Sequence, residues 1–179
     1  IKPEEKEIIE VIPEDVVVIL SQTGDIKRIP AKSFKVQKRN GKGVKNEGDA
    51  ILDVISTNTI DNLMLFTSKG KMYRLLVDNV PAGTNASKGV NISSLLNIEP
   101  DEKVIAMTSL NRKTDAEYVV FVTKQGLIKK TALEEYKSVK RNTGIAAIKL
   151  KEGDSIANVT FLKDEEIIVI TKEGMSIHF

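Results

Sequence analysis

The chain is built around four short apolar runs, at 16–20, 63–66, 118–122 and 167–170. None of them alternates polar with apolar residues, which is typical of strands buried on both faces. Each run is followed by a Ser/Thr-x-x-Gly turn and then by a basic segment, and this order predicts a hairpin. The four turns end at Gly24, Gly70, Gly126 and Gly174.

Two further features recur behind these turns. Gly43, Gly89 and Gly144 follow their turn glycines by 19, 19 and 18 residues, and each precedes an apolar residue. An acidic residue and another short apolar strand come next, at 51–55, 104–107 and 156–159. Because the turn glycines are 46, 56 and 48 residues apart, the period fits a four-stranded propeller blade.

The repeat therefore predicts an all-β fold, a propeller-like array of four-stranded blades. One blade cannot bury its apolar face alone, so the stack forms the core. We expect a single domain over 1–179 with a lead-in at 1–15 and about three and a half blades, at 16–62, 63–117, 118–165 and, in part, 166–179. The first residue, Ile1, and the unfinished fourth repeat favour a truncated piece of a longer protein.

Composition narrows the classes of function. The net charge is only +2, so a nucleic-acid site must be argued from where the charges lie. The absence of cysteine excludes disulfides and thiolate metal sites and is compatible with the cytosol. No apolar run approaches the ~20 residues of a membrane span. No phosphate loop occurs, and the single histidine, His178, has no evident nucleophile beside it, so we expect no active site in this chain.

Positive charge is concentrated at 26–46, where no acidic residue occurs. Glycines at 41 and 43 allow a loop to bring its N–H groups close to a partner. Basic side chains beside such a loop suit a polyanion, of which a phosphate backbone is the common case. The alternative is an ordinary solvated basic loop. The basic residues in this segment are Lys27, Arg28, Lys32, Lys35, Lys38, Arg39, Lys42 and Lys45.

The segment 37–43 resembles the A-box, Q-R-R-G-G-K-G, of the C-terminal domain of gyrase-type A subunits. Two positions depart from that motif: Lys38 keeps the charge, and Asn40 tolerates left-handed geometry better than most other non-glycine residues. The segments 12–18, 95–103 and 144–150 also resemble parts of this DNA gyrase domain, so the resemblance covers essentially the whole chain. The box here consists of Gln37, Lys38, Arg39, Asn40, Gly41, Lys42 and Gly43.

The resemblance implies a β-pinwheel with swapped strands that wraps duplex DNA on a basic rim, so that the ATP-dependent topoisomerase introduces negative supercoils. It implies no cofactor in this chain, because ATP and Mg²⁺ are used by other parts of the holoenzyme. The implied partners are double-stranded DNA, bound without sequence preference, and the other gyrase A and gyrase B parts of an A2B2 assembly. The implied location is the bacterial cytoplasm, at the nucleoid and away from membranes.

Two alternatives remain open. One is the C-terminal domain of the topoisomerase IV A subunit, whose box is degenerate or missing; the intact 41–43 segment speaks against it. The other, of a different class, is a propeller-like scaffold for protein partners. Aromatic residues are few and tryptophan is absent, which argues against a binder of single strands.

A row of four residues adds candidates for DNA contact. Arg28, Arg74, Lys130 and His178 stand four residues after the turn glycines, and this equivalence places them on one rim. For any one of them, protection of an exposed edge strand is an equally good explanation. The loops near Lys88 and 140–141 are expected to contact DNA less specifically or only to close the blades. Together with the box, the candidate DNA-binding residues are Lys27, Arg28, Lys35, Lys45, Arg74, Lys88, Lys130, Lys140 and Arg141.

Overall fold

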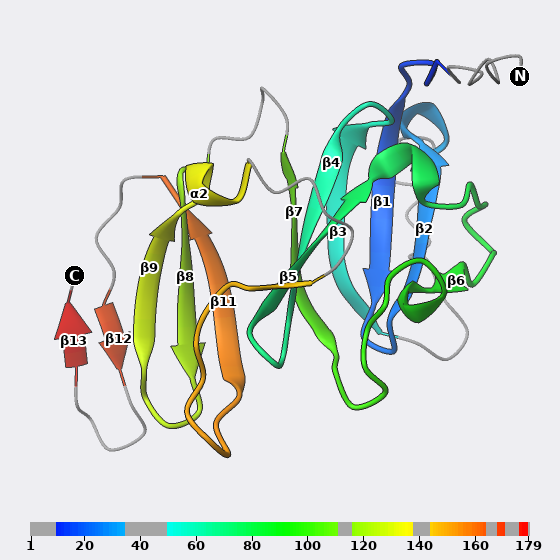
Figure 1. Ribbon diagram of the computed structural model, residues 1–179. Helices are drawn as coiled ribbons and strands as arrows, with labels where there is room; N and C mark the ends of the chain where they lie inside the picture. The colour runs from blue at the N-terminus through cyan, green and yellow to red at the C-terminus, as the bar shows by residue number, and fades with distance from the viewer. Residues whose placement is uncertain are drawn as a thin grey trace, which may run out of the picture.

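The computed structural model describes residues 10–34, 50–110, 116–137, 144–163, 168–170 and 176–178. In this part of the chain the strands form antiparallel sheets of four, four, three and two strands. The sheets follow one another along the molecule, with helical turns only at their edges (Figure 1). This arrangement confirms the predicted all-β fold.

The predicted hairpins and the strands behind them are present. The hairpins are β1 (Asp15–Ser21) with β2 (Asp25–Pro30), β4 (Asn62–Thr67) with β5 (Lys71–Leu76), β8 (Tyr118–Thr123) with β9 (Ile128–Ala132), and β12 (Ile168–Ile170) with β13 (Ser176–His178). The remaining strands are β3 (Ile51–Asn58), β6 (Val90–Asn91), β7 (Val104–Leu110), β10 (Ile145–Ala146) and β11 (Ile156–Leu162).

Two of the sheets contain a strand from the repeat that follows. The first sheet has the order β3-β1-β2-β6, and the second has the order β10-β5-β4-β7. Val90 of β6 lies opposite Ile26 of β2, and Ile145 of β10 lies opposite Met72 of β5. The strands that follow Gly89 and Gly144 are therefore donated to the preceding sheets. The predicted repeat limits describe the sequence period, and each of these two sheets crosses one of them.

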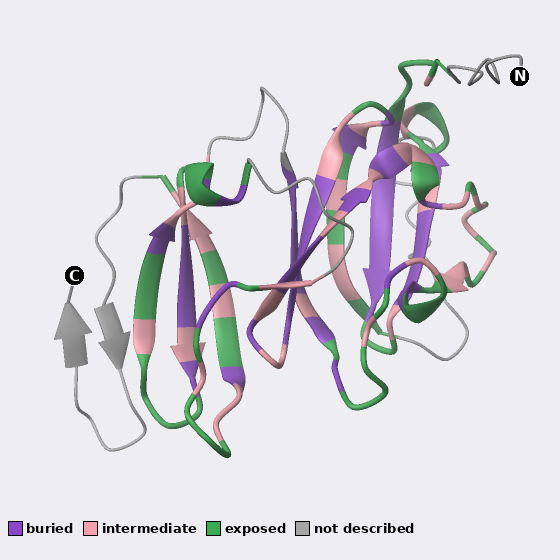
Figure 2. Ribbon diagram, viewed as in Figure 1, coloured by how far each residue is buried: buried purple, intermediate pink, exposed green. Residues whose placement is uncertain are grey.

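The apolar runs at 16–20, 63–66 and 118–122 are largely buried, as predicted. The two faces of β4 show why, because each face meets a different neighbour. In β4, Leu63 and Leu65 pack in one cluster with residues of the first sheet. Met64 and Phe66, which point the opposite way, pack in a second cluster with Val119 and Phe121 of the third sheet. The central strands are accordingly buried along their length, whereas the outer strands are mixed (Figure 2).

The lead-in is joined to the first sheet through Thr59, in the turn between β3 and β4. The Thr59 hydroxyl donates to the carbonyl of Ile12 at 2.7 Å and accepts from the N–H of Glu14 at 2.9 Å. The Thr59 N–H donates in turn to the carbonyl of Glu14 at 3.0 Å. These bonds bring 12–14 against the first sheet, while 1–9 lie outside the described residues.

Turn glycines allow the tight hairpin turns, and Gly70 also leaves room for a donated segment. Gly24, Gly70 and Gly126 all have positive φ, at 91°, 73° and 87°. A Cβ added at Gly70 would lie 2.8 Å from Ile148 Cγ2, and the carbonyl of Gly70 accepts from the N–H of Ala147 at 2.8 Å. A Cβ at Gly126 would meet nothing within 4 Å. The third sheet has no donated strand among the described residues.

This difference predicts unequal effects of Gly→Ala substitutions. Gly126→Ala is expected to lower the free energy of unfolding by about 1–2 kcal/mol, because only the left-handed backbone is penalised. Gly70→Ala adds a clash with the donated segment, which contributes about 1–3 kcal/mol more. Urea unfolding of both variants measures the difference. Equal losses in the two variants would contradict the packing of the donated segment over Gly70.

Candidate nucleic-acid interface

The box segment 37–43 lies outside the described residues, as do Lys35, Lys45, Lys140 and Arg141. Their contact with DNA stays a prediction. The other candidates, Lys27, Arg28, Arg74, Lys88 and Lys130, lie within the described part of the chain.

The four residues that follow the turn glycines by four positions occupy equivalent places in the hairpins. Arg28 lies opposite Val18, Arg74 opposite Met64, Lys130 opposite Val120 and His178 opposite Ile168. The registers confirm the equivalence that the sequence predicts.

Two members of this row connect neighbouring repeats. The Arg28 Nη1 donates to Asp78 Oδ1 at 3.0 Å, in the 3-10 helix η1 (Val77–Asn79) that follows β5. The Arg74 Nη1 donates to the carbonyl of Lys137 at 3.1 Å, at the end of helix α2 (Glu134–Lys137) behind β9. Each arginine thus reaches from its own repeat to the next, a role that neither phosphate contact nor edge protection describes. Their contact with DNA remains a prediction.

Lys27, which was predicted to contact DNA, is buried in the structure, and this burial argues against such a contact. Only 2% of Lys27 is exposed. Its ammonium donates to the carbonyls of Thr84, Asn85 and Ser87 at 3.0, 3.1 and 2.6 Å. Burial lowers the pKa of Lys27. The hydrogen-bond donors of the ammonium are therefore used by the protein's own backbone.

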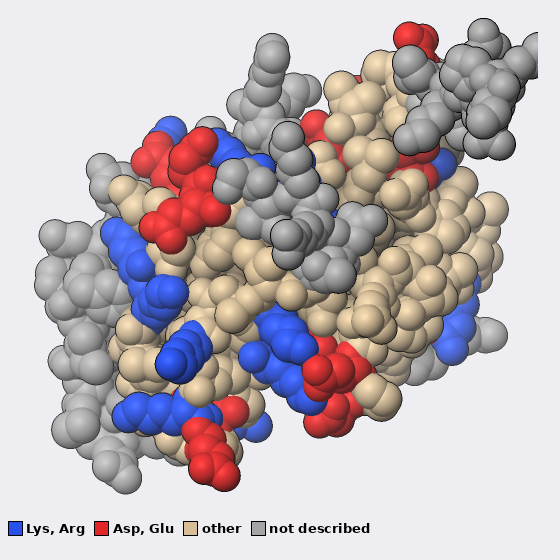
Figure 3. Space-filling view, in the orientation of Figure 1, with Lys and Arg blue, Asp and Glu red and all other residues tan. Residues whose placement is uncertain are grey.

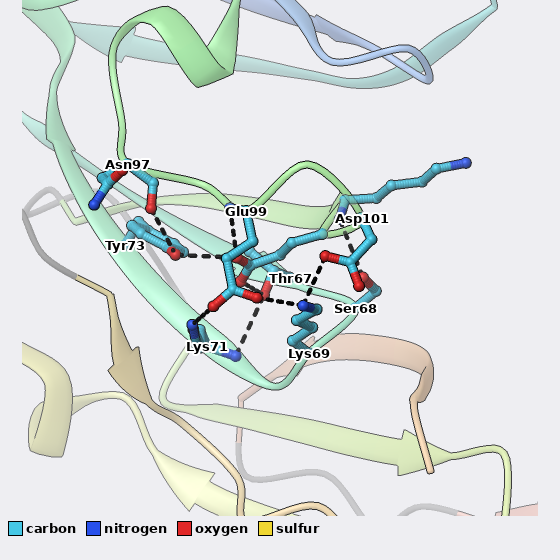
Figure 4. A network of polar contacts seen from close by, with 10 residues as sticks. Thr67, Ser68, Lys69, Lys71, Tyr73, Asn97, Glu99 and Asp101 are labelled. Carbon is cyan, nitrogen blue, oxygen red and sulfur yellow. Dashed lines mark hydrogen bonds and ion pairs between the residues drawn. The ribbon is translucent and has the colours of Figure 1, made fainter. Parts of the chain in front are cut away.

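The basic residues at the second turn are neutralised by a loop (Figure 4). Lys69 forms ion pairs with Glu99 and, at 2.7 Å, with Asp101, while Lys71 pairs with Glu99 at 2.8 Å. Glu102, in the same loop, is buried. These pairs balance positive charge with negative charge at this turn.

Glu102 supports this network from within the protein. Its Oε1 accepts from the Thr67 hydroxyl at 2.5 Å, and its Oε2 accepts from the Tyr73 hydroxyl at 3.2 Å and from the Glu99 N–H at 3.2 Å. Buried carboxylates require such donors. The hydrogen bonds fix the loop that carries Glu99 and Asp101 over the turn.

The third sheet presents lysines without this compensation. We define the third-sheet lysine surface as Lys124, Lys129, Lys130, Lys149 and Lys151, all of which are exposed. In the described part of the chain none of them forms a salt bridge to a carboxylate, although the charge of Lys151 interacts with the carboxylate of Asp154. Blue side chains gather over this sheet in Figure 3. The arrangement provides positive charge that can meet an anionic partner.

Two of these lysines are oriented by neighbours. The Lys130 ammonium lies 4.3 Å from the centre of the Tyr118 ring, a cation–π distance. The Lys129 ammonium donates to the carbonyl of Ala147 at 3.2 Å. Both contacts leave the positive charge uncompensated.

Sequence reasoning missed four members of this surface: Lys124, Lys129, Lys149 and Lys151. A signal was present, because the segment 124–151 contains eight basic residues against the acidic pair at 134–135. The denser positive charge around the box obscured it. Lys88, which was predicted, is exposed, with its ammonium 3.5 Å from Asp25.

The described ranges contain neither a candidate metal site nor a candidate membrane-spanning helix. There, no three His, Asp or Glu side chains come together as a possible metal site. No helix among the described residues has the length and apolar character to cross a membrane.

The ion pairs of Figure 4 predict a lowered pKa for the Glu99 carboxyl group and a pH-dependent stability. Hydrogen bonds from Lys69 and Lys71 lower the pKa of Glu99 to about 2. Since this pKa lies below its ordinary value, the stabilisation is present above about pH 4.5 and is lost as the pH falls toward 2. Exposure and salt keep the effect small. Carboxyl NMR should show the Glu99 pKa rising in Lys69→Met but not in the control Lys103→Met. An unchanged pKa in Lys69→Met would contradict the pairing.

Solved structures with the same fold are known. The C-terminal domain of DNA topoisomerase IV matches with a TM-score of 0.78 and 27% identity, over 94% of this chain and 52% of that one. A DNA gyrase A C-terminal domain matches with a TM-score of 0.57 and 24% identity, over 92% of this chain and 54% of that one, which supports the fold alone.

Sequence comparison identifies the family. The DNA gyrase A protein of Clostridium acetobutylicum is 37% identical over 93% of this chain and 20% of its own length. Its counterpart in Streptococcus pyogenes is 37% identical over 98% of this chain and 22% of its own length. The chain thus spans about a fifth of these curated relatives. The family model described as "DNA gyrase C-terminal domain, beta-propeller" matches residues 15–58, 61–111 and 117–163. The chain belongs to this family of DNA gyrase C-terminal domains.

Proposed function

We propose that this chain is a non-catalytic domain that binds duplex DNA and bends it around a basic rim. The observation that carries the proposal is the third-sheet lysine surface, whose charges are exposed and unpaired by carboxylates in the described residues. Membership of the gyrase C-terminal family supports it. The box at 37–43, which lies outside the described residues, would add further phosphate contacts.

The physical requirements of wrapping agree with this kind of surface. Smooth bending of DNA over a short site costs on the order of 1–6 kcal/mol, which many phosphate contacts must offset. Lysines contact phosphates without reading bases, so binding is indifferent to DNA sequence. A repeated fold suits the task because it places similar loops at regular intervals along the DNA path.

The larger assembly is also part of the proposal. In it, the chain forms part of a gyrase-type A subunit that acts with gyrase B in an A2B2 complex, which uses ATP and Mg²⁺ elsewhere. The wrapped DNA is presented as the passing segment, and the enzyme introduces negative supercoils. The complex works in the bacterial cytoplasm, at the nucleoid.

A part of topoisomerase IV is the second candidate within this class. The solved topoisomerase IV domain supports it through a TM-score of 0.78, but at 27% identity. The relatives that are 37% identical are gyrase A proteins, and the segment 41–43 keeps the end of the box. The gyrase assignment is therefore favoured.

The salt dependence of DNA binding tests the proposal. Affinity of the 179-residue chain for a duplex of arbitrary sequence is measured between about 50 and 200 mM salt. We expect the logarithm of the affinity to fall linearly with the logarithm of the salt concentration. Replacing Lys124 and Lys151 together by Gln should reduce this slope by about 1.8, because each phosphate that is no longer neutralised lowers it by about 0.9.

A charge-matched control is available in the same chain. Replacing Lys69 and Lys71 by Gln removes the same charge, but from lysines that are already paired with Glu99 and Asp101. This pair should leave the slope unchanged. Equal changes in both double variants would contradict the assigned surface. Absence of salt-dependent DNA binding would favour the protein scaffold.

A further inference from the structure

The segment 81–91 lies beside β2, first at Arg28 and then, as the donated strand β6, at Ile26 and Asp25. The Arg28 N–H donates to the carbonyl of Pro81 at 3.1 Å, and the Gly83 N–H donates to the carbonyl of Arg28 at 2.9 Å. The chain then turns at 84–87 and returns as β6, with Val90 opposite Ile26. A loop of the second repeat is thus attached along a strand of the first.

Lys27 holds the turn in this segment. An ammonium group has three donors, and here they meet the carbonyls of Thr84, Asn85 and Ser87. Because a buried charge is costly unless it is fully hydrogen-bonded, the ammonium and these three carbonyls depend on one another. The turn also closes on itself, since the Ser87 hydroxyl accepts from the Thr84 N–H at 3.0 Å and donates to its carbonyl at 2.9 Å.

Two glycines provide room for the Lys27 side chain. A Cβ added at Gly83 would lie 3.3 Å from Lys27 Cβ. A Cβ added at Gly89 would lie 3.2 Å from Lys27 Cβ and 2.6 Å from the carbonyl oxygen of Ile26. The loop therefore packs closely against the lysine stem at both glycines.

Lys88 directly follows the last of the three bonded carbonyls. Its side chain is 79% exposed, and its ammonium lies 3.5 Å from Asp25 Oδ2, a long contact that leaves it accessible. Any displacement of the Ser87 carbonyl moves the backbone that carries Lys88. The buried ammonium of Lys27 therefore controls where an exposed ammonium is presented.

We propose that Lys27 is a positioning residue, which fixes the 84–87 turn and so holds Lys88 in place to contact a DNA phosphate. This inference rests on the proposed function. Lys27 itself makes no contact with DNA in this proposal.

The residue equivalent to Lys27 in the next repeat makes a related contact. Tyr73 stands three residues after Gly70, as Lys27 stands three residues after Gly24. A Cβ added at Gly144 would lie 2.6 Å from Tyr73 Cζ, and Gly144 is the counterpart of Gly89. In both repeats this residue therefore packs against the glycine that precedes the donated strand.

Hydrogen exchange and salt-dependent DNA binding of the 179-residue chain test the role of Lys27. In Lys27→Met, the hydrogen-bonded amides of Thr84 and Ser87 should exchange about tenfold faster or more, because the turn loses the carbonyl hydrogen bonds to a charged group that hold it closed. The salt slope should fall by about 0.9, as in Lys88→Ala. The double variant should show no further fall, because both changes remove the same phosphate contact. Lys103→Met, which removes an exposed charge elsewhere, should leave exchange at 84–88 unchanged.

A second variant guards against loss of folding in Lys27→Met. Ser87→Ala removes the hydroxyl that closes the turn but leaves Lys27 and the core intact, and it should also speed exchange at 84–88 and reduce the salt slope. Unchanged exchange in Lys27→Met would overturn the inference, as would slope changes that add up in the double variant. If the chain binds no DNA, the proposed function fails. Faster exchange in Lys27→Met would then still support the conclusion that Lys27 stabilises the 84–87 turn.

Discussion

The central strand of each repeat must be covered on both faces, and this requirement shapes the molecule. Leu65 and Phe66 are neighbours in β4, yet they pack into the cores on opposite sides of it. A repeat is therefore completed by the repeats beside it, and stability is shared between neighbours along the array. Donation of β6 and β10 strengthens this dependence with hydrogen bonds. The third sheet, which has no donated strand in the described residues, leaves Leu127 37% exposed at the corresponding edge.

The environment of each lysine decides what its charge does. Lys27 is buried and bound to backbone carbonyls, whereas Lys69 is held by carboxylates. Lys130 lies exposed beside an aromatic ring. A net charge of +2 conceals these differences, because a few uncompensated charges on one sheet can attract a polyanion although the total is almost balanced.

The sequence predicted the local structure well because that structure depends on local chemistry. Apolar runs and turn glycines such as Gly70 identified the hairpins, and Gly89 and Gly144 identified the short strands that follow. The partner of each short strand depends on pairing across the repeats, which residue patterns do not encode. The burial of Lys27 was missed for the same reason: a lysine in a basic segment is expected to be exposed, and only the contact with the loop at 81–91 covers it. Arg28 and Arg74 were expected on a rim, but their bonds to the next repeat depend on tertiary contacts.

The most direct test of wrapping is a change in DNA topology. The chain is bound to nicked circular DNA, the nick is sealed, the protein is removed and the linking number is read. Wrapping with a defined hand predicts a shift that grows with the protein concentration and disappears when residues 37–43 are all replaced by alanine. Tight, salt-sensitive binding without any shift in linking number would contradict wrapping by this chain.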